Sequence, residues 1–216
     1  KNEIYRKSKC SSRGFYGCFK NLKGFILKCT SCDKLSLQII CKTCQTTLLA
    51  PNFYKKELEK DFFVYSFYDY KDLEDLIQSK YHFYGDRVFN ILAKLSFAKF
   101  ALNFEFTHPI LAIPIDDHTR HDFSQTAILA KHLKSSFIKP IFNTLKAKNI
   151  VKYAGKNLEF RQKNPRKFIY SGVKNCDVIL VDDVITTGTT ILEAKKALKK
   201  DGVNVLFALT LCSFLN

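Results

Sequence analysis

The chain has 216 residues, of which 46% are hydrophobic and 25% charged, a composition typical of folded globular proteins and not of disordered or fibrous ones. This length accommodates one sizeable α/β domain with a small appendage. No run of about 18 apolar residues is present, which argues against a membrane span. Residues 1–28 are basic but lack the apolar stretch of a secretory signal, and because the sequence contains no Met their status stays open.

The net charge is +15, from 35 Lys and Arg against 20 Asp and Glu. Such a charge attracts phosphate backbones and anionic membrane surfaces. The alternative is AT-rich codon usage, which favours Lys, Phe, Asn and Ile without any functional cause. The basic residues are interpreted as spread along the chain, and no basic tail is predicted.

Eight cysteines are present, and four of them form two C-x-x-C pairs separated by eight residues, an interval that suits a short hairpin. The pairs comprise Cys29, Cys32, Cys41 and Cys44. Four thiolates satisfy tetrahedral Zn²⁺ and leave no open position for catalysis, so the pattern predicts structural zinc, with an iron–sulfur or redox site as the alternative. Cys10 and Cys18 are expected to be free, and Cys176 and Cys212 to be buried packing residues. Without a secretion signal, this cysteine usage indicates a reducing cytoplasm.

Hydrophobic periodicity predicts strands alternating with helices, which indicates parallel β-α-β packing. In chain order we expect a strand at 61–68, helices at 70–80 and 85–102, a strand at 109–115, a polar loop at 116–120, a helix at 123–133, a strand within 137–145, a strand at 177–181, a helix at 190–200 and a strand at 203–211. Residues 146–167 are polar and very basic, and their length predicts a mobile functional loop.

One segment combines an apolar strand, two carboxylates, a Thr/Gly turn and a helix. It reads Val178-Ile-Leu-Val-Asp182-Asp183-Val184-Ile185-Thr186-Thr187-Gly188-Thr189-Thr190. The helix N-terminus offers unpaired N–H groups to a phosphate, Gly188 allows close backbone approach, and the threonine hydroxyls add donors. Phosphate would repel the carboxylates, so we expect them to bind sugar hydroxyls or help hold Mg²⁺. A purely structural strand, turn and cap is the alternative. The lysine of a Walker A loop is absent.

This segment resembles the ribose-phosphate binding motif of type I phosphoribosyltransferases, whose ligand is phosphoribosyl pyrophosphate (PRPP). The resemblance implies that Asp182 and Asp183 contact the ribose hydroxyls and that Thr186–Thr190 hold the 5′-phosphate. It also implies Mg²⁺ bound together with PRPP.

Residues 29–212 further resemble the ComF family, in which a Cys₄ zinc module precedes a phosphoribosyltransferase domain. The family's R-x-x-N-x-x-x-F pattern is matched by Arg161, Asn164 and Phe168, and its R-G-F-N-Q by Arg120, Phe123 and Gln125 with one inserted residue. A Lys-Tyr pair followed by Gly-Asp is common in the family after the first helix, and Lys80-Tyr81 with Gly85-Asp86 resembles it. Tyr153 departs from it, because a glutamine is common at that place.

The resemblance implies a type I phosphoribosyltransferase-like parallel sheet flanked by helices, and an organisation into a basic segment of uncertain status at 1–28, a Cys₄ zinc module at 29–50 and the transferase-like domain at 51–216. The loop 116–120 would face the pyrophosphate, with His118 and His121 solvated, and 146–167 would form a flap. Arg120, Arg161 and Lys80 are the candidate cations for the pyrophosphate. For Arg161 the alternative is a solvated basic face that it shares with Lys156, Lys163, Arg166 and Lys167.

The ComF resemblance implies a competence factor that binds PRPP and handles single-stranded DNA during natural transformation together with a DNA translocase or helicase. The resemblance also implies a cytoplasmic location, which includes the inner face of the cytoplasmic membrane. The alternatives are a nucleobase salvage phosphoribosyltransferase, for which no segment after Leu211 is predicted to build a base pocket, and a zinc-dependent adaptor. Catalysis, its acceptor and the oligomeric state stay open.

Overall fold

The structure is a computed structural model that describes residues 28–116, 119, 123–149 and 158–214. The chain divides into two units, the first ending at Cys41 and the second starting at Lys42. In the described part of the first unit, an isolated antiparallel bridge joins Lys28 and Leu35. Among the described residues, no helix has both the length and the apolar character needed to cross a bilayer.

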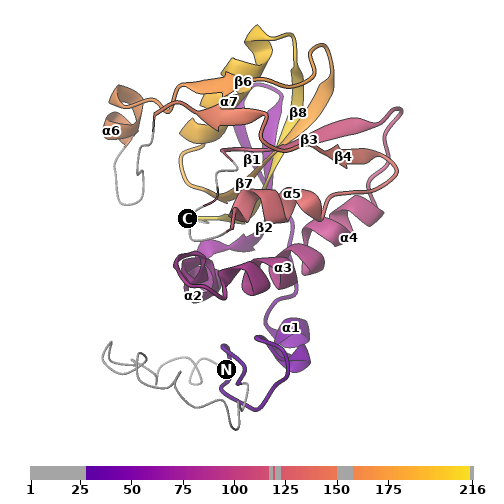
Figure 1. Ribbon diagram of the computed structural model, residues 1–216, viewed down its shortest axis with the longest axis vertical. Helices are drawn as coiled ribbons and strands as arrows, with labels where there is room; N and C mark the ends of the chain where they lie inside the picture. Colours follow the sequence, from indigo (N-terminus) through magenta and orange to yellow (C-terminus); the bar gives the residue numbers. More distant parts are fainter. Residues whose placement is uncertain (1–27, 117–118, 120–122, 150–157, 215–216) are drawn as a thin grey trace. The chain divides into compact units, whose positions relative to one another are not determined.

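The second unit alternates strands and helices along most of its length (Figure 1). Its elements are α1 (Lys42–Thr47), β1 (Tyr54–Glu59), β2 (Phe62–Asp69), α2 (Tyr70–Gln78), the 3₁₀ turn η2 (Ser79–Tyr81), α3 (Gly85–Leu95), α4 (Phe97–Leu102), β3 (Ile110–Pro114), α5 (Gln125–Lys131), β4 (Ile138–Pro140), β5 (Leu145–Ala147), α6 (Leu158–Lys163), β6 (Phe168–Tyr170), β7 (Asp177–Ile185), α7 (Thr189–Lys200) and β8 (Asn204–Ser213).

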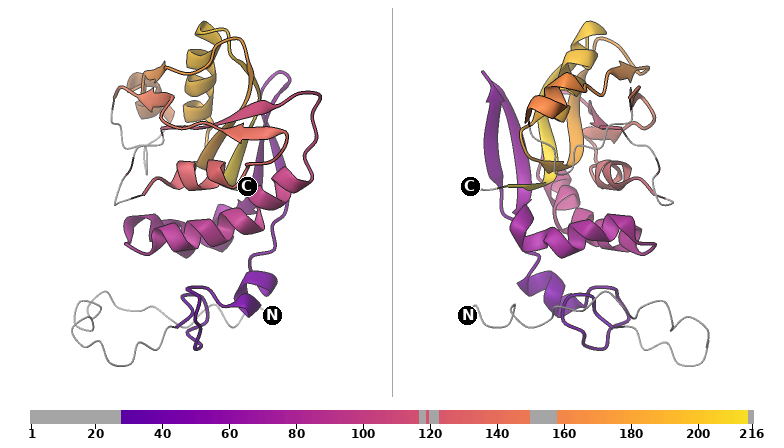
Figure 2. Two further views of the ribbon diagram at one scale, coloured as in Figure 1. Left: turned by 45° about the vertical axis from the view of Figure 1, so that its right-hand side comes forward. Right: turned by 90° about the vertical axis from the view of Figure 1, so that its left-hand side faces the viewer.

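Six strands form one sheet in the order β1-β2-β8-β7-β3-β4. All neighbouring pairs are parallel except β1 and β2, which form an antiparallel hairpin at one edge (Figure 2). The strand β7 lies in the middle of the sheet, and Val178 to Val181 are all buried. A continuous apolar run is what a parallel strand needs when both faces of the sheet are covered.

Helices cover both faces of the sheet. Val178 and Leu180 pack in one hydrophobic cluster with Ile191, Ala194 and Leu198 of α7. Successive side chains of a strand point to opposite faces, so the intervening residues of β7 face the other layer, where α5 contacts β7 and lies beside α3 (Figure 1). The expected α/β class, a mostly parallel sheet flanked by helices, is confirmed.

The connections diverge between β3 and β7, which are neighbours in the sheet. From β3 the chain passes through α5 to β4 on one side, and from β7 it passes through α7 to β8 on the other. In open α/β sheets a crevice forms at the carboxyl ends of the strands where the order reverses. The topology therefore places a ligand crevice at the ends of β3 and β7.

Most predicted elements are confirmed, and the differences have local causes. The helix expected at 85–102 is split at Ser96, whose hydroxyl donates to the carbonyl of Leu92 at 2.7 Å, a contact that bends helices. Only 138–140 of the strand expected within 137–145 joins the main sheet. The strand β1 and the helix α1 were not predicted, since the charged sequence of β1 suits an exposed edge and has no clear apolar alternation.

The interpretation of 146–167 as a loop is wrong for its described parts. Leu145–Ala147 and Phe168–Tyr170 pair as an antiparallel two-stranded sheet, and Leu158–Lys163 form a helix. The polar sequence is compatible with strands because only one face of this small sheet packs on the core.

Replacement of Gly85 tests the packing of α3. A Cβ at this position would meet the carbonyl oxygen of Ser79, and the Phe123 ring at 2.7 Å. Helix propensity alone favours Ala over Gly by about 1 kcal/mol, but overpacking costs about 1–3 kcal/mol. We expect Gly85→Ala to lower the free energy of unfolding in urea denaturation, whereas the exposed control Lys94→Ala should change it by less than about 0.5 kcal/mol. A Gly85→Ala protein as stable as the parent would contradict this packing.

Candidate functional site

A cavity of about 270 Å³ opens at the carboxyl ends of the parallel strands. Its lining comprises Tyr70, Gln78, Lys80, Tyr81, Arg166, Asp182, Asp183, Val184, Ile185, Thr186, Gly188, Thr189, Thr190, Ile191 and Phe214. This volume is close to the lower end of ligand pockets, about 300 Å³. The cavity therefore lies at the end of the sheet where the strand topology places a crevice.

Two adjacent carboxylates form the floor of this cavity. Asp182 Oδ1 accepts the backbone N–H of Asp183 at 2.9 Å, and Asp183 Oδ1 accepts that of Val184 at 2.8 Å. These bonds to the carboxylates' own strand fix their orientation at the end of β7. Both side chains are only partly exposed, so their mutual repulsion is less screened than at the surface.

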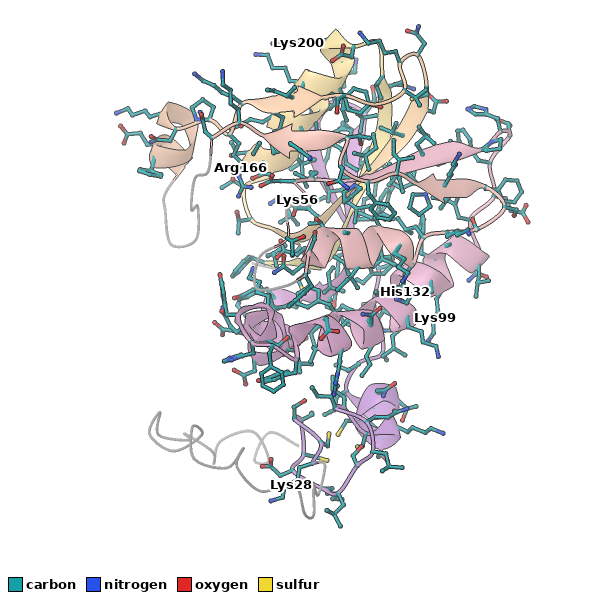
Figure 3. The ribbon with its side chains drawn as sticks, viewed as in Figure 1. Lys28, Lys56, Lys99, His132, Arg166 and Lys200 are labelled. Carbon is teal, nitrogen blue, oxygen red and sulfur yellow. The ribbon has the colours of Figure 1, made fainter. Side chains whose placement is uncertain are left out.

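Cations from two distant segments approach the carboxylates. Lys80 of η2 pairs with Asp183, with 2.9 Å between Nζ and Oδ2, and both side chains are about four-fifths buried. Arg166, which is labelled in Figure 3 and precedes β6, lines the same cavity. It pairs with Asp116, which follows β3, with 3.4 Å between Nη1 and Oδ2. The carboxyl ends of β3 and β7 are thus linked electrostatically through Arg166.

The two carboxylates differ in their pKa. Burial raises the pKa of Asp182 to about 8, the charge of Asp183 acts in the same direction, and Arg166 opposes both. Burial also disfavours the charged form of Asp183, but the ion pair with Lys80 outweighs it and lowers the pKa of Asp183. Near neutral pH the two carboxyl groups therefore bind one proton between them, and Asp182 carries it. A ligand or cation that needs both carboxylates ionised would displace that proton.

The turn after β7 presents the N-terminus of α7 to the cavity. Gly188 is the N-cap residue and has φ of 82°, a left-handed conformation that favours glycine. A Cβ there would also meet the side chain of Leu58 at 2.6 Å. Glycine supplies no capping side chain, and the Lys56 ammonium donates to the carbonyl of Thr186 at 2.9 Å. The helix end thus offers backbone N–H groups to an anion.

Aromatic side chains form the opposite wall. Tyr70 and Phe214 follow the ends of β2 and β8, and their rings stack with centroids 4.4 Å apart. Gln78 donates an N–H to the Tyr70 hydroxyl at 3.0 Å. Phe214 thus lines the cavity, although the sequence predicted no segment after Leu211 to build a base pocket.

The structure brings together most of the predicted site residues. Of the motif at 182–190 all but Thr187, which is exposed, line the cavity, and Lys80 joins them although it is about 100 residues away in the sequence. Arg120 lies outside the described residues, as do His118 and His121. Arg161 belongs to α6, but its side chain is outside the described part.

Sequence reasoning missed Arg166, Asp116 and the aromatic wall. Arg166 was assigned to a solvated basic face, but its side chain is only 18% exposed. Its backbone N–H also donates to the carboxylate of Glu193 in α7 at 2.8 Å. The sequence does not distinguish Arg166 from Lys167, whereas the position of Asp116 directly after a buried strand was a signal of the kind that identified Asp182.

The four cysteines of the C-x-x-C pairs come together in space. The sulfur atoms of Cys29, Cys32, Cys41 and Cys44 all lie within 4.8 Å of one another, and those of Cys32 and Cys41 are 3.8 Å apart. Four sulfurs about 2.3 Å from a central ion in a tetrahedron would be separated by about 3.8 Å. The donor set and its spacing fit a metal such as zinc.

Backbone N–H groups around Cys29 favour its thiolate form. Its sulfur accepts the N–H of Cys41 at 3.2 Å and that of Ser31 at 3.4 Å. Burial opposes ionisation, but these bonds outweigh it and lower the pKa of Cys29 to about 7. The thiolate is the form that binds metals.

Comparisons with known proteins point to phosphoribosyl chemistry in the proteins matched. No family model matches the chain. A ribose-phosphate pyrophosphokinase of Campylobacter jejuni is 32% identical over 105 residues, which cover 44% of this chain and 34% of the relative, so the match spans about a third of that protein's length.

Several solved structures also align with the chain. They include a hypoxanthine phosphoribosyltransferase of Staphylococcus aureus (17% identity, 58% of this chain and 62% of that one, TM-score 0.36), an adenine phosphoribosyltransferase of Leishmania donovani (14%, 74% and 75%, 0.40) and an orotate phosphoribosyltransferase of Mycobacterium tuberculosis (14%, 79% and 82%, 0.38). The strand order and the cavity, rather than these alignments, carry the account of the site.

Substitutions of Asp182 and Lys80 should change stability in opposite directions. Because the pKa of Asp182 is raised above its unfolded value of 3.8, this group destabilises the folded protein progressively as pH rises from about 4 to 8. We expect Asp182→Asn to raise the free energy of unfolding at pH 8 by about 0.5–2 kcal/mol and to have little effect at pH 4. Lys80→Met should lower it at pH 8 by about 1–3 kcal/mol, because the buried carboxylate of Asp183 loses its ion-pair partner. Urea titrations at both pH values measure this, and destabilisation by Asp182→Asn at pH 8 would contradict the shared-proton arrangement.

Loss of one cysteine ligand should release the metal. We expect Cys41→Ser to lose stoichiometric zinc and to unfold the surrounding segment, because metal binding supplies folding free energy there. Metal analysis of the purified protein measures the first effect, and proteolysis near residues 29–44 the second. Cys176→Ser, outside the cluster, is the control, and full zinc retention in Cys41→Ser would exclude the Cys₄ site.

Proposed function

We propose that the protein is a competence factor that binds PRPP with Mg²⁺ in this cavity and handles single-stranded DNA on the cytoplasmic side during natural transformation. The observation that carries the PRPP assignment is the paired carboxylate floor beside the threonine turn at the start of α7. This arrangement joins an anion site to hydroxyl-binding acceptors within one cavity.

Each part of PRPP has a matching part of the cavity. The N–H groups of the α7 N-terminus and the threonine hydroxyls take the 5′-phosphate, while Asp182 and Asp183 accept the ribose hydroxyls. Arg166 and Lys80, two cations of the cavity lining, would bind the pyrophosphate. Mg²⁺ commonly binds through one or two carboxylates and the phosphates of its substrate, and the two aspartates fit that role.

The proposal extends to the other parts of the chain by its resemblance to the ComF family. The Cys₄ module at 29–50 would be a structural zinc module before a transferase-like domain at 51–216. A DNA translocase would be the protein partner, and the net charge of +15 suits a phosphate backbone.

A phosphoribosyltransferase of the nucleobase salvage type is the second candidate, favoured by the Tyr70–Phe214 stack in the cavity wall. A planar base could pack on these rings. In the transfer, a nitrogen of the base would form a bond to the anomeric carbon while the bond to pyrophosphate breaks. Pyrophosphate would leave with the bonding electrons, and the proton of that nitrogen would pass to solvent. Release of pyrophosphate from PRPP with a panel of nucleobases distinguishes this enzyme from a PRPP-binding competence factor.

The site is tested by isothermal titration calorimetry with PRPP and Mg²⁺. We expect the double substitution Asp182→Asn with Asp183→Asn to abolish binding while leaving the circular dichroism spectrum unchanged, since amides are weaker acceptors for hydroxyls and weaker Mg²⁺ ligands. Asp177→Asn, at the opposite end of β7, is the control for the loss of an aspartate from this strand. Unchanged affinity in the double variant would refute the site.

The competence role is tested in cells by deletion of the gene. Loss of transformation with normal growth on media without nucleobases is the expected phenotype. Normal transformation with a requirement for added nucleobases would favour the salvage enzyme instead.

A further inference from the structure

The positive charge is concentrated in one segment, contrary to the expectation that it is spread along the chain. Residues 139–174 contain ten Lys and Arg and a single acidic residue, Glu159. This sixth of the chain thus carries a net charge of +9 out of the total of +15. Codon usage alone would enrich lysine throughout and would not deplete acidic residues from one segment.

Two strands within this segment form a ribbon with two different faces. In β5 and β6, Leu145 lies opposite Tyr170 and Lys146 opposite Ile169. The pairing continues beyond the strands, because the N–H of Lys148 donates to the carbonyl of Lys167 at 3.1 Å. Since directly paired residues lie on the same face of a sheet, Lys146 and Ile169 share one face. Lys148 and Lys167 follow them just beyond the strands and are both exposed.

The other face of the ribbon is part of the hydrophobic core. Leu145 is fully buried in the cluster below α7, and Phe168 and Tyr170 pack against that cluster. The face with the lysines points to solvent: all three lysines are exposed, and 57% of Ile169 is accessible. The fold therefore holds a row of lysines in place on a backbone that the core fixes.

The ammonium groups of these lysines form no ion pair within the described part of the molecule. No described carboxylate forms an ion pair with Lys146, Lys148 or Lys167, whereas Lys163 and Lys174 of the same segment pair with Glu159 and Asp201. Neighbouring exposed ammonium groups repel one another, and a bound polyanion would relieve that repulsion.

We propose that this outward face, defined by Lys146, Lys148, Lys167 and Ile169 and named here the lysine ribbon, binds the backbone of single-stranded DNA. The proposal rests on the DNA-handling part of the proposed function and gives it a location. Residues two apart on a strand are separated by about 6.8 Å, a distance similar to the spacing of phosphates in an extended single strand. Ile169, which is exposed and paired opposite Lys146, offers an apolar contact to unpaired bases, which a duplex keeps stacked inside.

The ribbon is continuous with the candidate PRPP cavity. Arg166, which lines that cavity, is the residue before Lys167, and the two point in different directions because Arg166 is largely buried and Lys167 exposed. Lys167 has φ of 52°, an uncommon left-handed conformation for a residue with a side chain. A single-stranded DNA bound along the lysine ribbon would therefore extend to the candidate PRPP site.

Fluorescence anisotropy with a labelled single-stranded oligonucleotide of mixed sequence tests the proposal. The variant is Lys146→Gln with Lys148→Gln and Lys167→Gln. The matched control removes the same charge from exposed lysines on the helical side, Lys94→Gln with Lys99→Gln and Lys134→Gln, where Lys99 lies well apart from Arg166 in Figure 3. Both proteins are first checked for unchanged PRPP affinity by calorimetry.

Each phosphate contact contributes about 0.7 to the slope of log affinity against log salt for single strands. We therefore expect the ribbon variant to bind more weakly at low salt and to lose about 2 from this slope, while the control keeps the parent slope. Equal losses in both variants, or an unaffected ribbon variant, would overturn the lysine ribbon alone. A duplex bound as tightly as the single strand would overturn its preference for single strands. A parent protein that binds no DNA at low salt would overturn both this proposal and the DNA-handling part of the proposed function, while leaving PRPP binding to be judged by calorimetry.

Discussion

Two carboxylates on consecutive residues at the buried end of β7 impose the main electrostatic constraint on this molecule. Strand geometry alone would turn Asp182 and Asp183 to opposite faces, yet both line one cavity. Their repulsion is met by a lysine from η2, by an arginine before β6 and by backbone N–H groups of β7 itself. A cavity that raises the pKa of one aspartate and lowers that of the next is a candidate ligand site.

The fold supplies these groups from several segments because the sheet gathers the carboxyl ends of its parallel strands at one edge. β3 contributes Asp116, β7 the aspartate pair, and β2 and β8 are followed by the aromatic wall. Arg166 connects two of these segments, since its side chain pairs with Asp116 while its backbone N–H donates to the carboxylate of Glu193 in α7. The candidate pyrophosphate and phosphate sides of the cavity are thereby joined through one residue.

The parts predictable from sequence are those whose partners are near in the chain. The turn from β7 into α7 carries its own signature, since an apolar run, two acids and a Thr/Gly turn are contiguous, and the C-x-x-C pairs likewise announce a common ligand. Lys80 was identified only through a family resemblance. Arg166 was not, because nothing local separates a buried arginine from its exposed neighbour Lys167.

Long-range contacts also explain why the sequence predicted a loop where β5 and β6 form the lysine ribbon. The segment from 146 to 167 has the composition of a loop, because exposed positions in and beside its short strand carry lysine, as at Lys146, Lys148 and Lys167. Its order depends on Leu145, Phe168 and Tyr170 packing under α7, contacts that join distant parts of the chain. A basic face on such a scaffold, beside the candidate phosphate-binding cavity, would connect the two halves of the proposed function.

The central claim is that the cavity at the end of β7 is a PRPP site organised by Asp182 and Asp183. The most direct measurement is a crystal structure of the protein with PRPP and Mg²⁺. The account predicts density for the 5′-phosphate against the turn Thr186–Thr190, with the ribose hydroxyls on the two carboxylates. Density for PRPP elsewhere, or its absence from this cavity at saturating concentration, would contradict it.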